Sequence, residues 1–188
     1  MKMPRKICLF ILLLCCLTGC RGEEIDTGAI SEYYAGLECL TVEAAITANS
    51  GVQVTYEILF TRTAEGDRVE ILAPESLAGI RARILPDKAE IEYDGMAVET
   101  LLPGISGYVP ADVVTGAAAD LAGGVPESFG YDQLDGARTL LLTYVEDVGD
   151  VTARKMLWLD PGSYSLLRGE FYLGEQMIME LRVKSFLA

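Results

Sequence analysis

The stretch VQVTYEILF, residues 52–60, decides the fold expected for this chain. Its apolar side chains fall on every second position, Val52, Val54, Tyr56, Ile58 and Phe60. Because successive side chains of a β-strand point to opposite faces, this alternation predicts a strand with one buried face. Residues 40–48 repeat the pattern, and Asn49-Ser50-Gly51 between the two stretches indicates a turn. The two strands should therefore pair as a hairpin.

The same alternation recurs along most of the chain and predicts about nine or ten strands. Asp94-Gly95 is a strong hairpin signal, since both central residues of the favoured two-residue turn need positive φ. Two segments, residues 27–36 and 109–123, have helical spacing instead. Residues 124–138 are interpreted as a loop through Pro126, Gly130 and Gly136. The further strands are expected at residues 68–72, 80–84, 88–93, 96–101, 139–146, 152–159, 164–173 and 176–186.

A long sheet with one apolar face twists, and that face has to be covered. The pieces available to cover it are the two predicted helices. The sequence therefore predicts an α+β, mainly β fold. Its centre is a strongly curved antiparallel sheet, an incomplete β-barrel, wrapped around one or two short helices.

The beginning of the chain predicts export. Lys2, Arg5 and Lys6 precede an apolar run at residues 7–17, which is too short for the ~20 residues that span a bilayer. The run ends in Leu17-Thr18-Gly19-Cys20, which resembles the lipobox of bacterial lipoproteins, where cleavage before the cysteine leaves a diacylated thiol. An ordinary signal peptide is the alternative.

This interpretation divides the chain into three parts. Residues 1–19 form the lipoprotein signal peptide, residues 20–27 the lipidated Cys20 and a tether, and residues 28–188 a single half-barrel domain. Two or more acyl chains hold a protein stably at a membrane. We therefore expect a protein anchored to the cell membrane on its extracytoplasmic side.

The charge balance excludes one class of partner. The chain has 28 acidic and 15 basic side chains and a formal charge of −13. Binding to nucleic acid needs clustered Lys and Arg against the phosphates, so no nucleic-acid partner is expected. Acidity alone usually reflects solubility, and it identifies no partner.

Signatures of catalysis are missing. The chain has no histidine, which excludes Ser-His and Cys-His nucleophile pairs and histidine-ligated zinc. Ser106 fails the Gly-x-Ser-x-Gly spacing by one residue. We predict no enzyme, no cofactor and no metal. A calcium site near Asp147 and Asp150 is the less favoured alternative to a solvated turn. Cys39, which has no disulfide partner once the signal and Cys20 are set aside, is expected to be a small buried hydrophobe rather than a nucleophile.

The order of predicted elements resembles the lipoprotein-carrier superfamily (LolA/LolB-like). Two local segments carry the resemblance, Leu77-Ala78-Gly79-Ile80 leading into Glu92-Tyr93-Asp94-Gly95, and Leu157-Trp158-Leu159-Asp160-Pro161 before the last two strands. The resemblance implies an incomplete β-barrel closed by helices that handles acylated proteins or other apolar ligands. The soluble carriers lack a lipid anchor and keep an arginine in the cavity. Cys20 therefore favours an anchored acceptor, sensor or adaptor, and some tethered members bind a partner protein.

The apolar face has two interpretations. Its side chains either fill the core or partly line a cavity for an acyl chain, where methionines adapt to an irregular ligand. The leading hypothesis is a non-catalytic lipoprotein that binds a lipid, or the acyl chains of a lipoprotein, in the half-barrel. The alternative is a tethered adaptor for an envelope protein, with a filled interior. The cavity candidates are Val54, Tyr56, Ile58, Phe60, Ile91, Tyr93, Met156, Trp158, Met177 and Met179.

Overall fold

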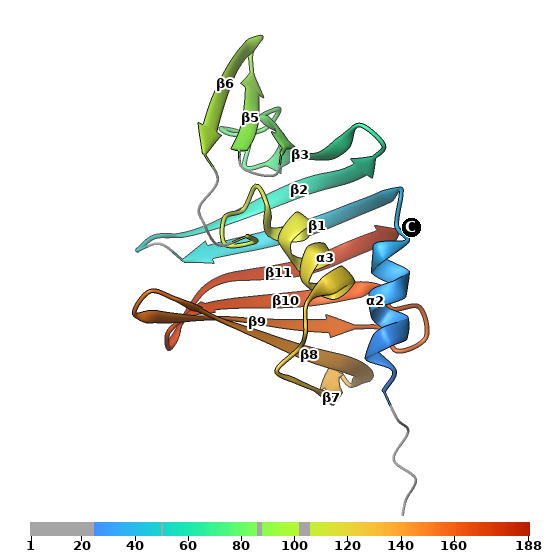
Figure 1. The fold of residues 1–188 in the computed structure, drawn as a ribbon. Helices are drawn as coiled ribbons and strands as arrows, with labels where there is room; N and C mark the ends of the chain where they lie inside the picture. The colour runs from blue at the N-terminus through green and yellow to red at the C-terminus, as the bar shows by residue number, and fades with distance from the viewer. Residues whose placement is uncertain (1–24, 50, 86–87, 102–105) are drawn as a thin grey trace, which may run out of the picture.

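The computed structural model describes residues 25–49, 51–85, 88–101 and 106–188. Cys20, the predicted signal peptide and the first residues of the predicted tether lie outside these ranges. The described residues form one antiparallel sheet of 11 strands with two helices on it (Figure 1). The sheet is curved and stays open, and its two edges are different strands. The predicted mainly β fold with a curved, incomplete barrel is confirmed.

The strands follow the predicted alternation closely, and the first and last of them pair in the middle of the sheet. They are β1 (Leu40–Asn49), β2 (Gln53–Thr63), β3 (Gly66–Ala73), β4 (Arg81–Ile84), β5 (Lys88–Tyr93), β6 (Met96–Leu101), β7 (Ser128–Leu134), β8 (Ala137–Val148), β9 (Val151–Leu159), β10 (Leu166–Leu173) and β11 (Gln176–Leu187). The order across the sheet is β6-β5-β4-β3-β2-β1-β11-β10-β9-β8-β7, so each half is a simple meander and β6 and β7 form the edges.

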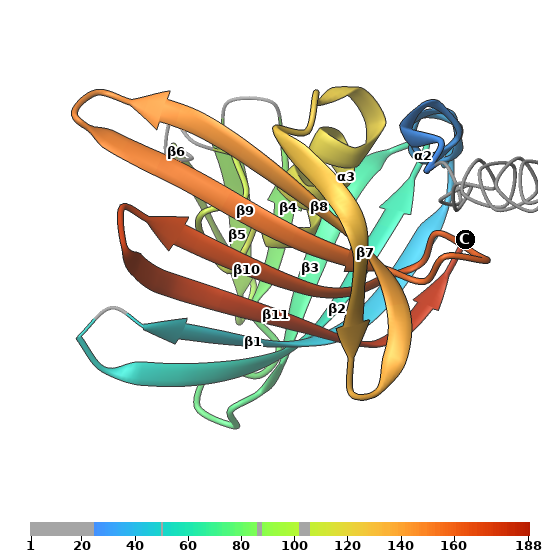
Figure 2. The ribbon, with the colours of Figure 1, turned by 90° about the horizontal axis from the view of Figure 1, so that it is seen from below.

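The helices are α2 (Thr27–Ala35) and α3 (Val113–Gly123). Figure 2 shows both on the same side of the bent sheet, which we call the inner face. Helix α2 begins at Thr27, because the Asp26 side chain accepts a hydrogen bond from Ala29 N–H and caps the helix. Gly36 ends the helix as predicted.

The main core lies between the inner face and the helices. In β1, Leu40, Val42, Ala44 and Ile46 are buried on alternate positions, as the period of two requires. Helix α3 is poor in charge and buries most of its circumference, including Val113, Val114, Gly116, Ala117, Ala118 and Leu121. The hydrophobic core therefore closes over β1, β2 and β8–β11.

The predicted start of α3 and the predicted loop at residues 124–138 were wrong. Helix α3 begins at Val113 instead of residue 109, because the Asp112 side chain bonds upstream, accepting from Gly107 N–H (2.9 Å) and Val109 N–H (3.2 Å). The segment 128–134, interpreted as a loop, is strand β7 and forms a hairpin with β8. Asp135 and Gly136 make the turn, both with positive φ, as do Asp94 and Gly95 between β5 and β6.

Candidate functional site

An apolar recess of about 230 Å³ opens on the inner face beside α3. Strands β2 to β5 form its floor, and residues 109–111, which precede α3, form one wall. No charged side chain lines it. The lining residues are Tyr56, Ile58, Val69, Ile71, Ile80, Ala82, Ile91, Val109, Pro110 and Ala111.

Asp112 holds the wall of the recess in place. Its carboxylate accepts the backbone N–H groups of Gly107 and Val109, so the chain turns over the sheet before the helix starts. Burial raises the pKa of the Asp112 carboxyl, and the two backbone hydrogen bonds and the charge of Lys155 oppose that rise. The recess thus depends on a turn that hydropathy patterning does not reveal.

Exposed apolar side chains extend the floor of the recess onto β5 and β6. Ile91 pairs with Val98, and Tyr93 pairs with Met96, so these side chains share the inner face. Tyr93, Met96 and Val98 are 46%, 65% and 63% exposed. We call these three residues the apolar shelf. Strand β6 is also an edge strand, so its outer backbone groups pair with no other described strand.

The structure divides the ten cavity candidates into groups. Tyr56, Ile58 and Ile91 line the recess, and Tyr93 lies on the shelf beside it. Phe60 and Met179 are packed in the core, with 0% and 1% exposed. Val54 is half-buried on the same face of β2, opposite Ala48.

The remaining three candidates point away from the recess. In β9 the inner face carries Ala153, Lys155, Leu157 and Leu159, so Met156 and Trp158 lie on the outer face. Trp158 donates from Nε1 to Asp132 Oδ2 at 2.8 Å, and the Arg168 guanidinium lies over its ring. That hydrogen bond lowers the pKa of the Asp132 carboxyl. Met177 pairs with Tyr172 next to a bulge and shares that outer face.

Charged groups on the inner face were missed by the sequence reasoning. Arg62 forms a two-pronged pair with Asp67, Nε to Oδ1 at 2.8 Å and Nη2 to Oδ2 at 2.7 Å. Thr115 of α3 donates to the same Asp67 Oδ2 at 2.9 Å. Lys155 pairs with Asp120 of α3 at 2.7 Å. Arg62 lies two residues after Phe60, and Lys155 lies two residues before Leu157. The alternation along each strand could therefore have placed both charged side chains on the inner face.

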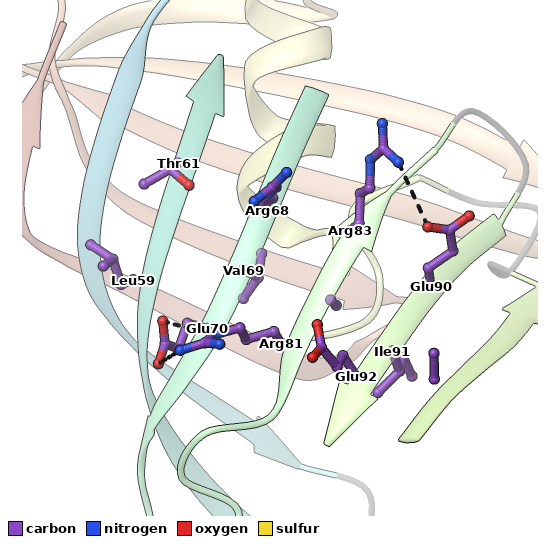
Figure 3. Close-up of a pocket in the computed structure, with 12 residues that line it drawn as sticks. Leu59, Thr61, Arg68, Val69, Glu70, Arg81, Arg83, Glu90, Ile91 and Glu92 are labelled. Carbon is purple, nitrogen blue, oxygen red and sulfur yellow. Dashed lines mark hydrogen bonds and ion pairs between the residues drawn. The ribbon is translucent and has the colours of Figure 1, made fainter. Parts of the chain in front are cut away.

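The outer face of β2–β6 carries a larger hollow of about 500 Å³ with a different chemistry (Figure 3). Its charges are largely paired across strands, as in Arg81 with Glu70 at 3.4 Å and Arg83 with Glu90 at 3.8 Å. An apolar ligand would have to desolvate these groups, so the hollow suits water. It is lined by Leu59, Thr61, Arg68, Val69, Glu70, Arg81, Ala82, Arg83, Glu90, Ile91, Glu92 and Ala97.

Three further observations on the described residues concern Cys39, metal binding and membrane-spanning helices. Cys39 is exposed, so the expectation of a buried thiol was wrong; it precedes Leu40, whose side chain takes the inward position. In the described ranges no three or more His, Cys, Asp or Glu side chains gather as a metal site. Within the same ranges neither helix is long and apolar enough to cross a bilayer.

This chain is similar to known proteins in its fold. No protein-family profile matches the sequence, and no curated protein matches it. An uncharacterized conserved protein from Thermus thermophilus is similar in structure, with a TM-score of 0.53, 15% identity, and 86% of this chain and 84% of that one covered.

Two further solved structures are more distant. Lipoprotein LppX from Mycobacterium tuberculosis gives a TM-score of 0.47 at 15% identity, covering 85% of this chain and 92% of LppX. A LolA superfamily protein from Nitrosomonas europaea gives 0.43 at 14% identity, covering 87% and 93%. The architecture itself is an open, curved antiparallel sheet with two helices on its inner face. This architecture agrees with the incomplete β-barrel and covering helices that the sequence resemblance to LolA-like carriers implied.

Proposed function

We propose that this protein is a membrane-anchored, non-catalytic binding protein of the cell envelope that takes an apolar group, the acyl chain of a lipid or of a lipoprotein, into the recess on its inner face. The observation that carries the proposal is the recess itself, which is lined by apolar side chains and continues onto the exposed apolar shelf. Large apolar side chains exposed together mark binding surfaces.

The size of the recess limits what it can hold. Pockets that enclose a whole drug-sized ligand measure ~300–1,000 Å³, and this one is about 230 Å³. It therefore suits one end of an acyl chain, with the remainder lying along the apolar shelf. Each buried methylene contributes ~0.8 kcal/mol, so affinity should rise about fourfold per methylene until the recess is full.

A series of fatty acids of increasing chain length tests this proposal. Competition with a fluorescent fatty acid should show affinity that climbs with length and then levels off. Substituting Ala111→Phe fills the recess from its wall and should weaken binding at least tenfold. Ala137→Phe, at the exposed start of β8, is the matched control and should bind as the wild type. Lipid extracts of the purified protein, analysed by mass spectrometry, should contain acyl lipids.

The anchor is tested separately. Labelled palmitate should attach to the wild-type chain and fail to attach after Cys20→Ala. Label on the variant, or none on the wild type, would refute lipidation at Cys20 and leave the recess to be judged by the fatty acid series.

A tethered adaptor is the second candidate, and two observations favour it. Side chains fill the space under the helices, with Phe60, Leu142, Leu157, Phe171 and Leu181 no more than 1% exposed. The edge of β6 pairs with no other described strand and adjoins the apolar shelf, which suits addition of a strand from a partner protein. Photocrosslinking in cells from Val98, with exposed Val145 as the control position, should then trap an envelope protein. Lipid-free extracts with no fatty acid binding would decide for the adaptor.

A further inference from the structure

A second cavity, of about 250 Å³, lies on the inner face at the other end of α3. It is bordered by the last turn of α3, by residues 124–125 and by β8 and β9. Its chemistry contrasts with the apolar recess, because Tyr108, Asp120, Tyr144, Glu146 and Lys155 all line it. We call it the polar cavity.

The Tyr108 hydroxyl is the group whose hydrogen bonding points to a ligand in this cavity. Tyr108 is 9% exposed, and its Oη is buried with no hydrogen-bond partner among the described residues. A buried phenol hydroxyl normally finds a partner, since without one it loses its hydrogen bonds to water and gains none in return. The ring cannot escape easily, because it packs edge-on against Phe171 and under the Lys155 ammonium. Tyr108 lines the polar cavity, so a ligand that displaces the atoms now covering the hydroxyl would give it its missing partner.

Lys155 supplies donors at the same place. Its side chain is buried, and Nζ uses one N–H on Asp120 Oδ2 at 2.7 Å while lying 5.3 Å from the centre of the Tyr108 ring. An ammonium has three donors, so the pair leaves capacity for an acceptor. An apolar ligand would cover these groups without satisfying them, which makes it a poor occupant.

The charges of the wall disfavour ions of either sign. Among the lining side chains, Asp120 and Glu146 give two carboxylates against one ammonium. Burial, and after it the field of these two carboxylates, raises the pKa of the Tyr108 hydroxyl, and the charge of Arg154 opposes part of that rise. An anion would meet this excess of negative charge. A cation would lie beside the buried Lys155 ammonium, where like charges repel more strongly than they do in water.

We infer that the polar cavity binds a neutral polyhydroxy ligand of the size of one sugar ring. Hydroxyl groups both donate and accept, so one ring can accept from Lys155 and Tyr108 and donate to Asp120 and Glu146. The ring of Tyr144 adds a flat surface for the C–H face of a sugar. The site is separate from the apolar recess, and the inference stands whether or not the recess binds acyl chains.

Three probes with the same ring and different charge test the inference: methyl β-glucopyranoside, glucosamine and glucuronate. Saturation-transfer NMR and titration of the intact mature protein should show millimolar binding of the neutral glucoside, at least fivefold tighter than that of either charged sugar. No binding of the glucoside at 50 mM, or tighter binding of glucosamine or glucuronate, would overturn the assignment.

Variants locate the site. Tyr108→Phe removes only the unpartnered hydroxyl, so binding of the glucoside should fall at least fivefold while the protein stays as stable or becomes more stable. Glu146→Gln, at the exposed rim, should weaken binding of the glucoside and strengthen binding of glucuronate. This variant tests the site even if Tyr108→Phe does not fold. Tyr131→Phe, on edge strand β7, is the control and should bind normally. Unchanged binding by Tyr108→Phe, or loss of sugar binding in Ala111→Phe, would refute this location.

Discussion

Two parts of one sheet differ in what covers them. Strands β1, β2 and β8–β11 lie under α2 and α3, and their inner side chains are almost fully buried. Strands β4–β6 extend beyond the helices (Figure 1) and bury only Ala82, Ile84 and Ala89, while every residue of β6 is exposed. The alternation of the sequence is equally clear in both parts. The alternation of apolar residues thus specifies a strand and its inward face. Whether that face becomes core or binding surface depends on whether the helices α2 and α3 cover it.

The largest expected effect is the difference in stability between a substitution in the covered part of the sheet and one in the uncovered part. Phe171→Ala should reduce the free energy of unfolding by about 3–5 kcal/mol, because the side chain is 0% exposed and leaves a cavity in the core. Val98→Ala on the bare edge should change it by no more than about 0.5 kcal/mol. Urea denaturation followed by circular dichroism measures both. Equal costs would mean that β6 is covered in solution.

The next largest loss of stability is expected at the junction between the covered and the uncovered strands. Asp67 lies on β3, pairs with Arg62 of β2 and accepts from Thr115 of α3, so it ties the helix to the strand next to β4. Asp67→Ala should cost about 2–3 kcal/mol, since hydrogen bonds to a charged group are lost and a part-buried guanidinium stays unpaired.

Glu70→Ala is the matched control for Asp67. Glu70 pairs with Arg81 on the outer face of the same strand, where an exposed pair contributes less than about 1 kcal/mol. If both substitutions cost the same, Asp67 does not join the two parts.

A smaller effect tests how closely α3 approaches the neighbouring loop. A Cβ at Gly116 would lie 2.5 Å from the Gly107 backbone, so Gly116→Ala should cost about 1–3 kcal/mol through overpacking. At Gly123, the last residue of α3, a Cβ would meet nothing within 4 Å, and Gly123→Ala should be neutral or stabilising by up to about 1 kcal/mol. Thermal unfolding of the two variants measures the contrast, and a harmless Gly116→Ala would show that the loop lies farther from the helix.

The smallest expected effect is a pH dependence at the recess wall. Because burial raises the pKa of Asp112 above its value in the unfolded chain, the folded state binds the proton more tightly. Its stabilising contribution is complete below the unfolded pKa and is lost as pH rises through the folded pKa.

Asp112→Asn removes this contribution, so the cost of the substitution should shrink from pH 4 to pH 7, by at most about 1.4 kcal/mol for each unit of pKa difference. Unfolding at several pH values measures that cost. Asp135→Asn in the exposed β7–β8 turn is the control and should show a constant difference. A cost that grows with pH would contradict the raised pKa.

The sequence predicted most of the sheet because the alternation and the turns are local signals. The Asp94-Gly95 turn correctly placed β5 and β6, and Asp135-Gly136, the same dipeptide signal, would have revealed β7 had it been weighed against Gly130 and Pro126. The faces of β9 were harder to assign. Leu157, Trp158 and Leu159 are all apolar and all buried, so hydropathy cannot tell which two point inward.

The candidate site was only partly predictable for a different reason. Its floor follows from the alternation that includes Tyr56, Ile58 and Ile91, but its wall depends on where α3 starts. That start is set by two hydrogen bonds from backbone N–H groups to the Asp112 side chain. The polar cavity likewise depends on Tyr108 and Asp120 meeting Lys155 across more than 30 residues of chain, which no local pattern encodes.

The pairing of β1 with β11 at the centre of the sheet has a consequence for the order of folding. β1 pairs with β11 from Thr41 opposite Leu187 to Ala48 opposite Met179, so residues near the two ends of the described chain must find each other. Contacts between residues far apart in sequence slow folding, because the loop entropy is lost before the contacts form. During synthesis the β1–β2 hairpin can form early, yet the sheet becomes continuous only after residues 176–187 have left the ribosome. Until then the hairpin carries an open edge of its own, to which a strand of another chain could pair before β11 arrives.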